Sequence, residues 1–229
     1  MNRSFFVRYG ISTLGLIVVA LGVGVSIKSN LGIAPLSCIP TVLSLEFTDI
    51  HIGSLTSLGI FTWAFNLLFI VLQAFILRKN FSAKLLLQVL PIFLFGYLVD
   101  AAAWLFDAFN SPATNYFTQI LLCLAAVFLT AVGIRLEVLG QGWILPADNT
   151  IHIITQVRSA KYGTVKVIMD VTLVAITVLL ALVFFGLFTG NGETVVIREG
   201  TVIQAVLTGI CMKFTDPILN RWFGHMVTK

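Results

Sequence analysis

Hydrophobic residues fall along the chain in long uninterrupted blocks, and this pattern predicts six helices that cross a membrane. A spanning helix needs about 20 predominantly apolar residues. The segments that meet this requirement are 8–27, 56–77, 85–106, 116–136, 164–188 and 201–219. The first segment follows Arg3 and Arg8 and contains no small-residue cleavage site. We therefore expect it to be a retained membrane helix and not a cleaved signal peptide.

Two further apolar segments, 35–45 and 146–157, are too short to span. Each is about 11 residues long and follows a glycine- and proline-containing break, LGIAP in the first case and GWILP in the second. At about 1.5 Å per residue, a helix of this length reaches only halfway across the bilayer. The sequence therefore predicts two half-spanning helices.

Lysine and arginine residues predict the orientation in the membrane. With six crossings and a cytoplasmic N-terminus, twelve of the 14 basic residues lie on the inner side, and only Lys28 and Arg198 lie outside. Such an excess on the cytoplasmic side is typical of bacterial inner-membrane proteins. Counting either short segment as a full crossing would reverse the later loops and remove the excess. We expect a multi-pass protein with both termini in the cytoplasm.

Composition agrees with a chain that is surrounded by lipid. Hydrophobic residues make up 58% of the sequence and charged residues 10%, and the mean hydropathy is +1.01. A soluble domain carries about 25% charged residues. The net charge of +4 comes from short clusters between apolar spans, so it does not indicate nucleic-acid binding. The cysteines have no metal-ligand spacing and no nucleophile–base pair is recognisable, so we expect no enzyme, cofactor or metal site.

The two halves of the sequence repeat one pattern. In each half a long helix with a late glycine leads to a proline-containing break, a short helix and two more long helices. Matching positions, in order, are Gly22 and Gly133, Gly59 and Gly163, Asn66 and Asp170, Gln88 and Gln204, and Asp100 and Asp216. With three crossings per unit, the second unit is inverted relative to the first. The predicted fold is an all-α membrane protein of two inverted three-helix repeats, 1–110 and 111–229.

Several runs of sequence resemble a known family. GVGVSIKSNLGIAPLSCIP, LQAFILRK, LLLQVLPIFLFGYLVDAA and EGTVIQAVLTG are similar to the YczE/YitT-type family of bacterial integral membrane proteins, over nearly the whole chain. The resemblance implies a polytopic membrane protein that acts as a transporter. Family members often carry an acidic residue just after the proline of the first break, where this chain has Leu36, Ser37 and Cys38. Here the acidic residue occurs only in the second break, as Asp148.

The two breaks are the candidate solute site. A half-helix that begins inside the bilayer leaves about four backbone N–H groups unpartnered, and its dipole favours a negative group there. Pro35 and Pro146 suit the first helical turn because proline lacks an N–H. We expect PLS (35–37) and PADN (146–149) to meet near the midplane; alternatively, their polar residues only cap the helices. The predicted substrate-binding residues are Pro35, Ser37, Cys38, Asn66, Pro146, Asp148, Asn149 and His152.

Ionisable residues within the spans are the candidates for ion coupling. They are Asp100, Asp148 and Asp170. Asp170 has Lys166 one helical turn earlier, so the two form either a structural pair or part of a proton- or cation-coupling site. His152 is either a proton-relay partner or a packed histidine. Arg135 and Glu137, beside the second break, are expected to extend to the inner face.

These features favour a secondary transporter that moves a small polar or charged solute, with proton or cation coupling. Broken helices in corresponding positions of two repeats are typical of such transporters. An aquaporin-like channel for a small solute and a non-transporting membrane regulatory partner are the alternatives. The expected partners are the lipid bilayer and the solute, and the chain acts either as a monomer or as a homodimer.

Overall fold

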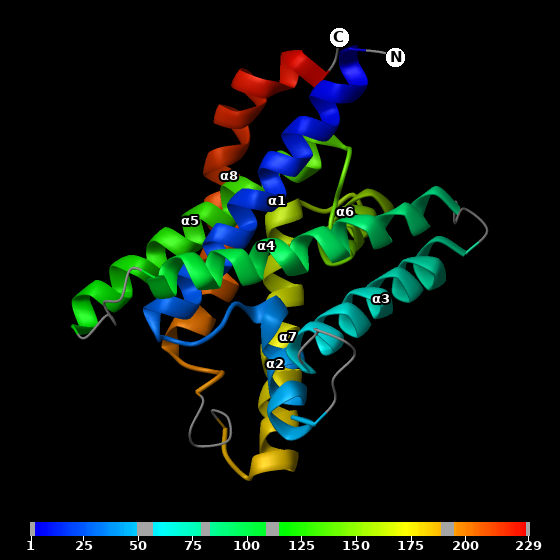
Figure 1. Ribbon diagram of the computed structural model, residues 1–229. Helices are drawn as coiled ribbons and strands as arrows, with labels where there is room; N and C mark the ends of the chain where they lie inside the picture. The colour runs from blue at the N-terminus through cyan, green and yellow to red at the C-terminus, as the bar shows by residue number, and fades with distance from the viewer. Residues whose placement is uncertain (1–2, 50–56, 79–82, 109–114, 189–194, 228–229) are drawn as a thin grey trace.

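The computed structural model describes residues 3–49, 57–78, 83–108, 115–188 and 195–227, and most of these residues are helical (Figure 1). The helices are α1 (Arg3–Ser29), α2 (Pro35–Glu46), α3 (Ser57–Leu77), the 3-10 helix η2 (Ala83–Gln88), α4 (Val89–Ala108), α5 (Tyr116–Gly140), α6 (Pro146–Arg158), α7 (Tyr162–Phe185) and α8 (Glu199–Val227). The predicted all-helical fold class is confirmed for this part of the chain.

Five of the described helices are long and apolar enough to cross a membrane, namely α1, α3, α5, α7 and α8. Their outward side chains include large hydrophobic residues, such as Phe75 at 73% and Val183 at 78% exposure. Such surfaces are stable only against lipid, so the chain is a multi-pass membrane protein. The sixth predicted span, 85–106, is not confirmed, because the apolar stretch found there is the shorter Leu85–Val99.

Both predicted short helices are present, and each begins at its proline. The residues before them, Ala34 and Leu145, have extended backbones, and Pro35 and Pro146 occupy the first helical turn. Proline at this position sacrifices no hydrogen bond and has the φ angle that a helix requires. The two breaks in the sequence therefore determine where α2 and α6 start.

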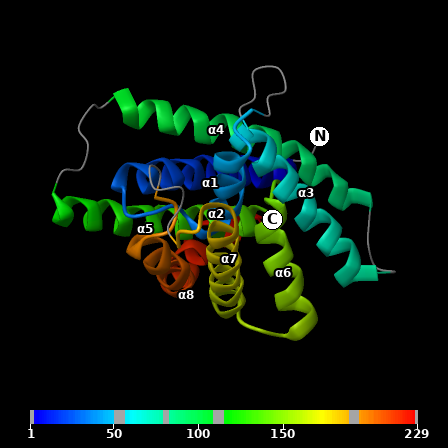
Figure 2. The ribbon, with the colours of Figure 1, turned by 90° about the horizontal axis from the view of Figure 1, so that it is seen from below.

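Among the described helices, α1 and α5 have the most extensive contact and lie antiparallel, side by side (Figure 2). Glycines allow this approach. A Cβ atom added at Gly15 would lie 2.7 Å from the carbonyl oxygen of Gly133, and one at Gly133 would lie 2.7 Å from the backbone nitrogen of Val19. Small residues that bring two backbones together are characteristic of helix pairs in membranes.

We expect Gly133→Ala to destabilise the protein by about 1–3 kcal/mol, because the new methyl group overlaps backbone atoms of α1 that cannot move away. Gly10→Ala is the control. Gly10 lies in α1, and a Cβ atom added there meets nothing within 4 Å. Thermal unfolding of both purified variants in detergent measures the difference. An unchanged Tm for Gly133→Ala would contradict the close packing.

Each break is held by residues from the other half of the chain. In the first break, the Ile33 amide donates to the Val196 carbonyl at 3.0 Å, and the Gly200 amide donates to the Leu31 carbonyl at 2.9 Å. In the second, the Arg8 guanidinium donates to the Gln141 side-chain oxygen at 2.7 Å. These contacts satisfy backbone and side-chain polar groups that lipid could not satisfy.

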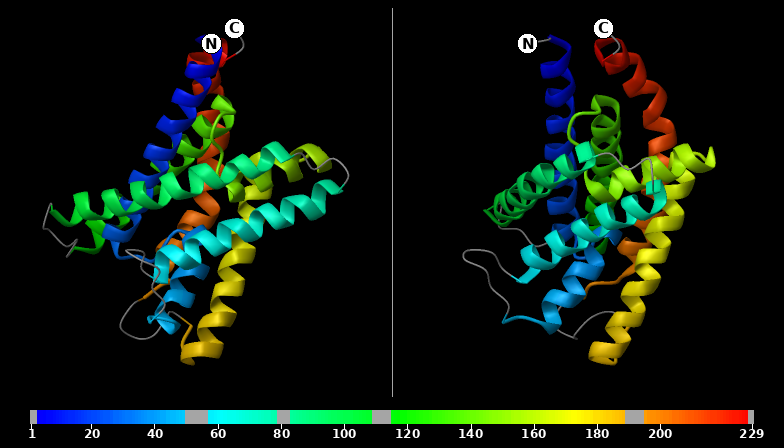
Figure 3. Two further views of the ribbon diagram at one scale, coloured as in Figure 1. Left: turned by 45° about the vertical axis from the view of Figure 1, so that its right-hand side comes forward. Right: turned by 90° about the vertical axis from the view of Figure 1, so that its right-hand side faces the viewer.

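The start of α1 and the end of α8 lie at the same end of the molecule (Figure 3). At the other end, the last turn of α1 lies close to the first turn of α8, where Arg198 Nη1 donates to the Asn30 carbonyl at 2.8 Å. The helix α8 continues through Pro217 to Val227, beyond the predicted end at residue 219. The helix α7 ends at Phe185, earlier than predicted, because Gly186 adopts a left-handed backbone with φ of 67°.

Candidate functional site

A buried cavity of about 40 Å³ lies where the first turns of α2 and α6 approach each other; we call it the polar cavity. Pro35, Leu36 and Ser37 line it from α2, and Leu145 and Asp148 line it from the second break and α6. Its other polar lining residues are Thr130, Lys166, Asp170, Gln204 and Thr208. Residues from both halves of the chain therefore face one space.

Charged side chains gather on the α6 and α7 side of this cavity. The ammonium of Lys166 donates to Asp170 Oδ1 at 3.0 Å and lies 3.8 Å from Asp148 Oδ1. All three side chains are nearly inaccessible, at 2–5% exposure. Glu137 is also fully buried beside this group. Three carboxylates and one ammonium leave a formal excess of two negative charges when all are ionised, and burial makes that excess costly.

Glu137 is a buried charged residue whose position the sequence analysis predicted wrongly. It was expected to extend to the inner face, but its side chain is 0% exposed. Its Oε2 atom accepts a hydrogen bond from the Leu145 amide at 3.1 Å, which satisfies a backbone donor at the start of α6. The helix α5 continues to Gly140, past the predicted end at residue 136, and this extra turn directs Glu137 inward. The carboxylate thus ties α5 to the second break.

We expect Glu137→Ala to cost about 1–3 kcal/mol of stability, because it leaves the buried Leu145 amide without its acceptor. Glu137→Gln keeps an oxygen in the same place and removes the charge, so it should retain most of the stability. Chemical unfolding of the three proteins in mixed micelles checks this. Equal losses for the alanine and glutamine variants would show that the charge, and not the hydrogen bond, is what stabilises the break.

A second polar network joins α3 to α6. The Gln73 side chain is fully buried, and its Nε2 atom donates to the Pro146 carbonyl at 2.8 Å. Gln88 Nε2 and Asn149 Nδ2 both donate to Gln73 Oε1, at 3.0 and 3.1 Å. The sequence signal for Gln73 was an amide inside an apolar span, where it needs a partner. Asn149 therefore belongs to this bridge between the halves and does not line the polar cavity.

The remaining predicted site residues have other surroundings. Cys38 packs in an apolar cluster with Val42 and Ala181 and does not itself line either cavity. Asn66 donates to the Thr62 carbonyl of its own helix at 2.9 Å, while its side-chain oxygen has no partner in the described structure. His152 is half-buried with its Nε2 atom 3.0 Å from Gln156 Nε2. Asp100 lies in α4, but its side chain is outside the described residues.

Of the predicted residues, the polar cavity brings together Pro35, Ser37, Asp148 and Asp170. Tyr162 adds a further contact, since its hydroxyl donates to the Asp148 carbonyl at 3.3 Å. Arg135 lies apart from this group and forms an ion pair with Asp216 of α8. The roles of these residues in binding a solute or coupling ion remain predictions.

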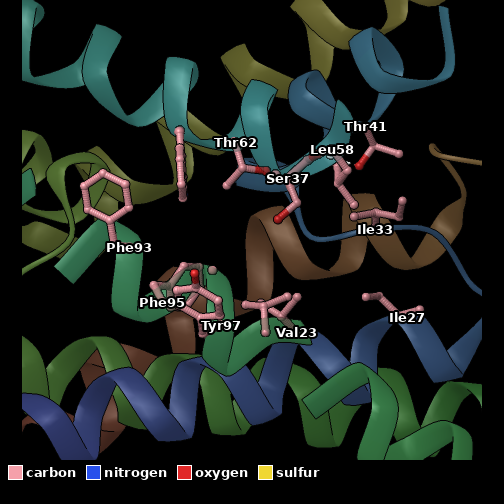
Figure 4. A pocket seen from close by; sticks show the side chains of 14 residues that line it. Val23, Ile27, Ile33, Ser37, Thr41, Leu58, Thr62, Phe93, Phe95 and Tyr97 are labelled. Atoms are coloured by element: carbon pink, nitrogen blue, oxygen red, sulfur yellow. Dashed lines mark hydrogen bonds between the residues drawn. The ribbon is translucent and has the colours of Figure 1, made fainter. Parts of the chain in front are cut away.

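A larger cavity of about 250 Å³ adjoins the polar cavity between α1, α2, α3 and α4; we call it the apolar chamber (Figure 4). Ser37 and Thr62 point into it from one side, and Val23 and Phe95 face them from the other. Its aromatic lining consists of Trp63, Phe93, Phe95 and Tyr97. Val23, Ser37 and Phe95 line both cavities, so the two spaces are neighbours.

The long apolar helices define a multi-pass membrane protein, and charged side chains are buried between them. The chain belongs to DUF6198, a family of unknown function, which it matches over residues 6–217. It is also 25% identical to the uncharacterized protein YyaS of Bacillus subtilis (strain 168) over 220 residues, covering 95% of each chain. These matches do not confirm the narrower resemblance to YczE/YitT-type proteins. No solved structure matches the chain.

Proposed function

We propose that the protein is a secondary transporter that moves a small polar or charged solute across the bacterial inner membrane. One observation carries this proposal: the first turns of both short helices, together with Asp148, Lys166 and Asp170, line one buried cavity. Transporters built from repeats bind their substrate where broken helices meet near the midplane. The charged groups then serve as the coupling site.

An inverted repeat is the arrangement that would let this cavity open alternately to either side. Pro35 and Pro146 are 111 residues apart, as are Gly22 and Gly133, and Gly15 and Ala126. The contacts follow the same offset: a Cβ atom at Gly22 would meet the Ala126 carbonyl, and one at Gly133 would meet the Gly15 carbonyl. Reciprocal contacts of this kind support a pseudo-two-fold axis between α1 and α5.

The positions of the chain ends support six crossings. The start of α1 and the end of α8 lie together, whereas five crossings would place them on opposite faces of the membrane. We therefore propose that α4 crosses as well. The repeats are then 1–110 and 111–229, and both termini are cytoplasmic.

Only one half of the chain carries an acidic residue at the start of its short helix, and this asymmetry would couple transport to an ion. Ser37 occupies in the first half the position of Asp148 in the second, again 111 residues apart. The groups that face Asp148 are Glu137 from α5, and Tyr162, Lys166 and Asp170 from α7. Lys166 balances only one of the three carboxylates, so the cavity is stable when it also holds a proton or a cation. Exchange of that ion with the solute would link the two fluxes.

Reconstitution into liposomes tests the function. Purified protein would be challenged with small amines, amino acids, organic acids and inorganic cations, with and without a pH gradient, while transient currents and internal pH are recorded. We expect a saturable response to one class of solute that depends on the gradient. Fast, non-saturating flux would indicate a channel and not a carrier. If folded protein gave no response to any solute in the panel, transport would be contradicted and a regulatory partner favoured.

A further inference from the structure

The polar cavity and the apolar chamber share Val23, Ser37 and Phe95, but they differ in size, and charged residues line only the polar cavity. A cavity needs about 10–15 Å³ to hold one water molecule, so 40 Å³ accommodates one small polar group or a few waters. The apolar chamber, at about 250 Å³, is six times larger. A solute that occupies both spaces has a small polar head and an apolar body.

Oxygen atoms without a hydrogen bond, in and near the polar cavity, indicate the charge of that head. Asp148 Oδ1, in the cavity lining, and Glu137 Oε1, outside that lining, are buried and accept no hydrogen bond in the described structure. Lys166 is 3.8 Å from Asp148 and donates instead to Asp170. A hydrogen-bond donor is therefore missing, and a cationic donor fits best because Lys166 is the one described ammonium beside three carboxylates. An ammonium group supplies three N–H donors. A carboxylate or phosphate head would meet the excess negative charge and be repelled.

Two competing ligands fit less well. The helix dipoles of α2 and α6 would favour an anion, but Glu137 already accepts the hydrogen bond from the Leu145 amide at the start of α6. A metal ion would need several converging ligands, and the residues described here include no cluster of three or more histidine, cysteine, aspartate or glutamate side chains suited to one. An organic cation fits the negative charge of the site, and it needs neither free helix N-terminal amides nor several converging ligands.

Aromatic rings line the space for the body of the solute. Trp63 and Phe93 meet edge to face with ring centroids 4.4 Å apart, and Phe95 lies where the chamber joins the polar cavity. Aromatic faces bind apolar groups and attract cations. Leu58, Phe93 and Tyr97 line the chamber and are 41–67% exposed on the surface that faces lipid, so an amphipathic solute can enter from the membrane.

We infer that the solute is a small organic amine with an aromatic or aliphatic body, whose ammonium group binds Asp148 in the polar cavity and whose body occupies the apolar chamber. This inference rests on the proposed transport function and specifies its substrate class. The amine replaces the proton or cation that otherwise balances the carboxylates, which makes the transporter an exchanger of organic cations.

Binding to the purified wild-type protein tests the inference by calorimetry with four probes. Phenethylammonium carries both features, methylammonium carries only the head, 3-phenylpropanol carries only the body, and phenylacetate carries the opposite charge. We expect phenethylammonium to bind at least about tenfold more tightly than each of the others. Equal or tighter binding of the alcohol or the carboxylate, or no binding of phenethylammonium, would overturn the inference.

One variant, with a matched control, tests whether the apolar chamber binds the body of the solute. Trp63→Ala should weaken phenethylammonium binding several-fold and leave methylammonium binding unchanged, whereas a general loss of structure would weaken both. Asp216→Asn is the matched control, because Asp216 pairs with Arg135 outside the cavity lining, and it should bind all probes as the wild type does. Saturable transport of a carboxylate or neutral solute would contradict the inference and leave the proposed function standing. Silence of every solute in liposomes would contradict the proposed function itself.

Discussion

Asp148→Asn is expected to reduce solute-driven transport at least about 30-fold while the protein remains folded. The side chain keeps its shape but loses the charge that would hold a proton or cation in the polar cavity. A buried ionic interaction is worth about 2–5 kcal/mol, and each 1.4 kcal/mol is a factor of ten. Transient currents in liposomes measure the loss, and the elution profile of the detergent-solubilised variant reports its folding.

The matched control for this experiment is Asp216→Asn. Asp216 is 40% exposed and forms an ion pair with Arg135, and it does not line the polar cavity. It should transport like the wild type, because a carboxylate this open to water contributes little to an ion pair. If both variants lose activity equally, the effect follows from general charge or stability and not from the polar cavity. Full activity of Asp148→Asn would remove this residue from the coupling site.

Lys166→Met should be the most destabilising single substitution among those considered. Lys166 supplies the only described ammonium beside three buried carboxylates, and it donates to Asp170 at 3.0 Å. Removing one partner of a buried ion pair costs about 3–5 kcal/mol because the other charge is left without compensation. Unfolding by added anionic detergent, followed by circular dichroism, measures this loss.

A double variant separates the charge effect from the loss of packing. Lys166→Met with Asp170→Leu removes both partners and should recover most of the lost stability, since a buried pair can be replaced by apolar residues at little cost. Lys213→Met is the control for loss of a lysine, because Lys213 is exposed on α8. A loss below about 1 kcal/mol for Lys166→Met would mean that Asp148, Asp170 and Glu137 are not simultaneously ionised beside it.

Local features made the two short helices predictable. Pro35 and Pro146 each follow a glycine-containing break, and the structure begins α2 and α6 at these two residues. Proline excludes the preceding residue from the helix and fits the first turn, so the start of each helix depends on a few neighbours in sequence. The apolar spans were predictable for a similar reason, because length and hydropathy alone decide whether a helix suits the bilayer.

Glu137 and Gln73 show where sequence reasoning ended. A charged residue near the end of an apolar segment suggests an interfacial position, yet Glu137 is buried because the Leu145 amide lies within its reach. The hydrogen-bond partners of Gln73 are Pro146, Gln88 and Asn149, two of which belong to the other half of the chain. No pattern within one helix specifies such partners.

The sequence alone determined that this chain is a helical membrane protein with two short helices and with ionisable residues inside its apolar segments. Those properties follow from hydropathy, proline geometry and the cost of charge in lipid, each of which acts over a few neighbouring residues. Only the tertiary structure decided which carboxylates share one ammonium, and that Ser37 and Asp148 face one cavity with an aromatic chamber beside it. Those properties depend on which faces of α1, α5, α6 and α7 pack together, and this packing is set by contacts between residues far apart in the chain.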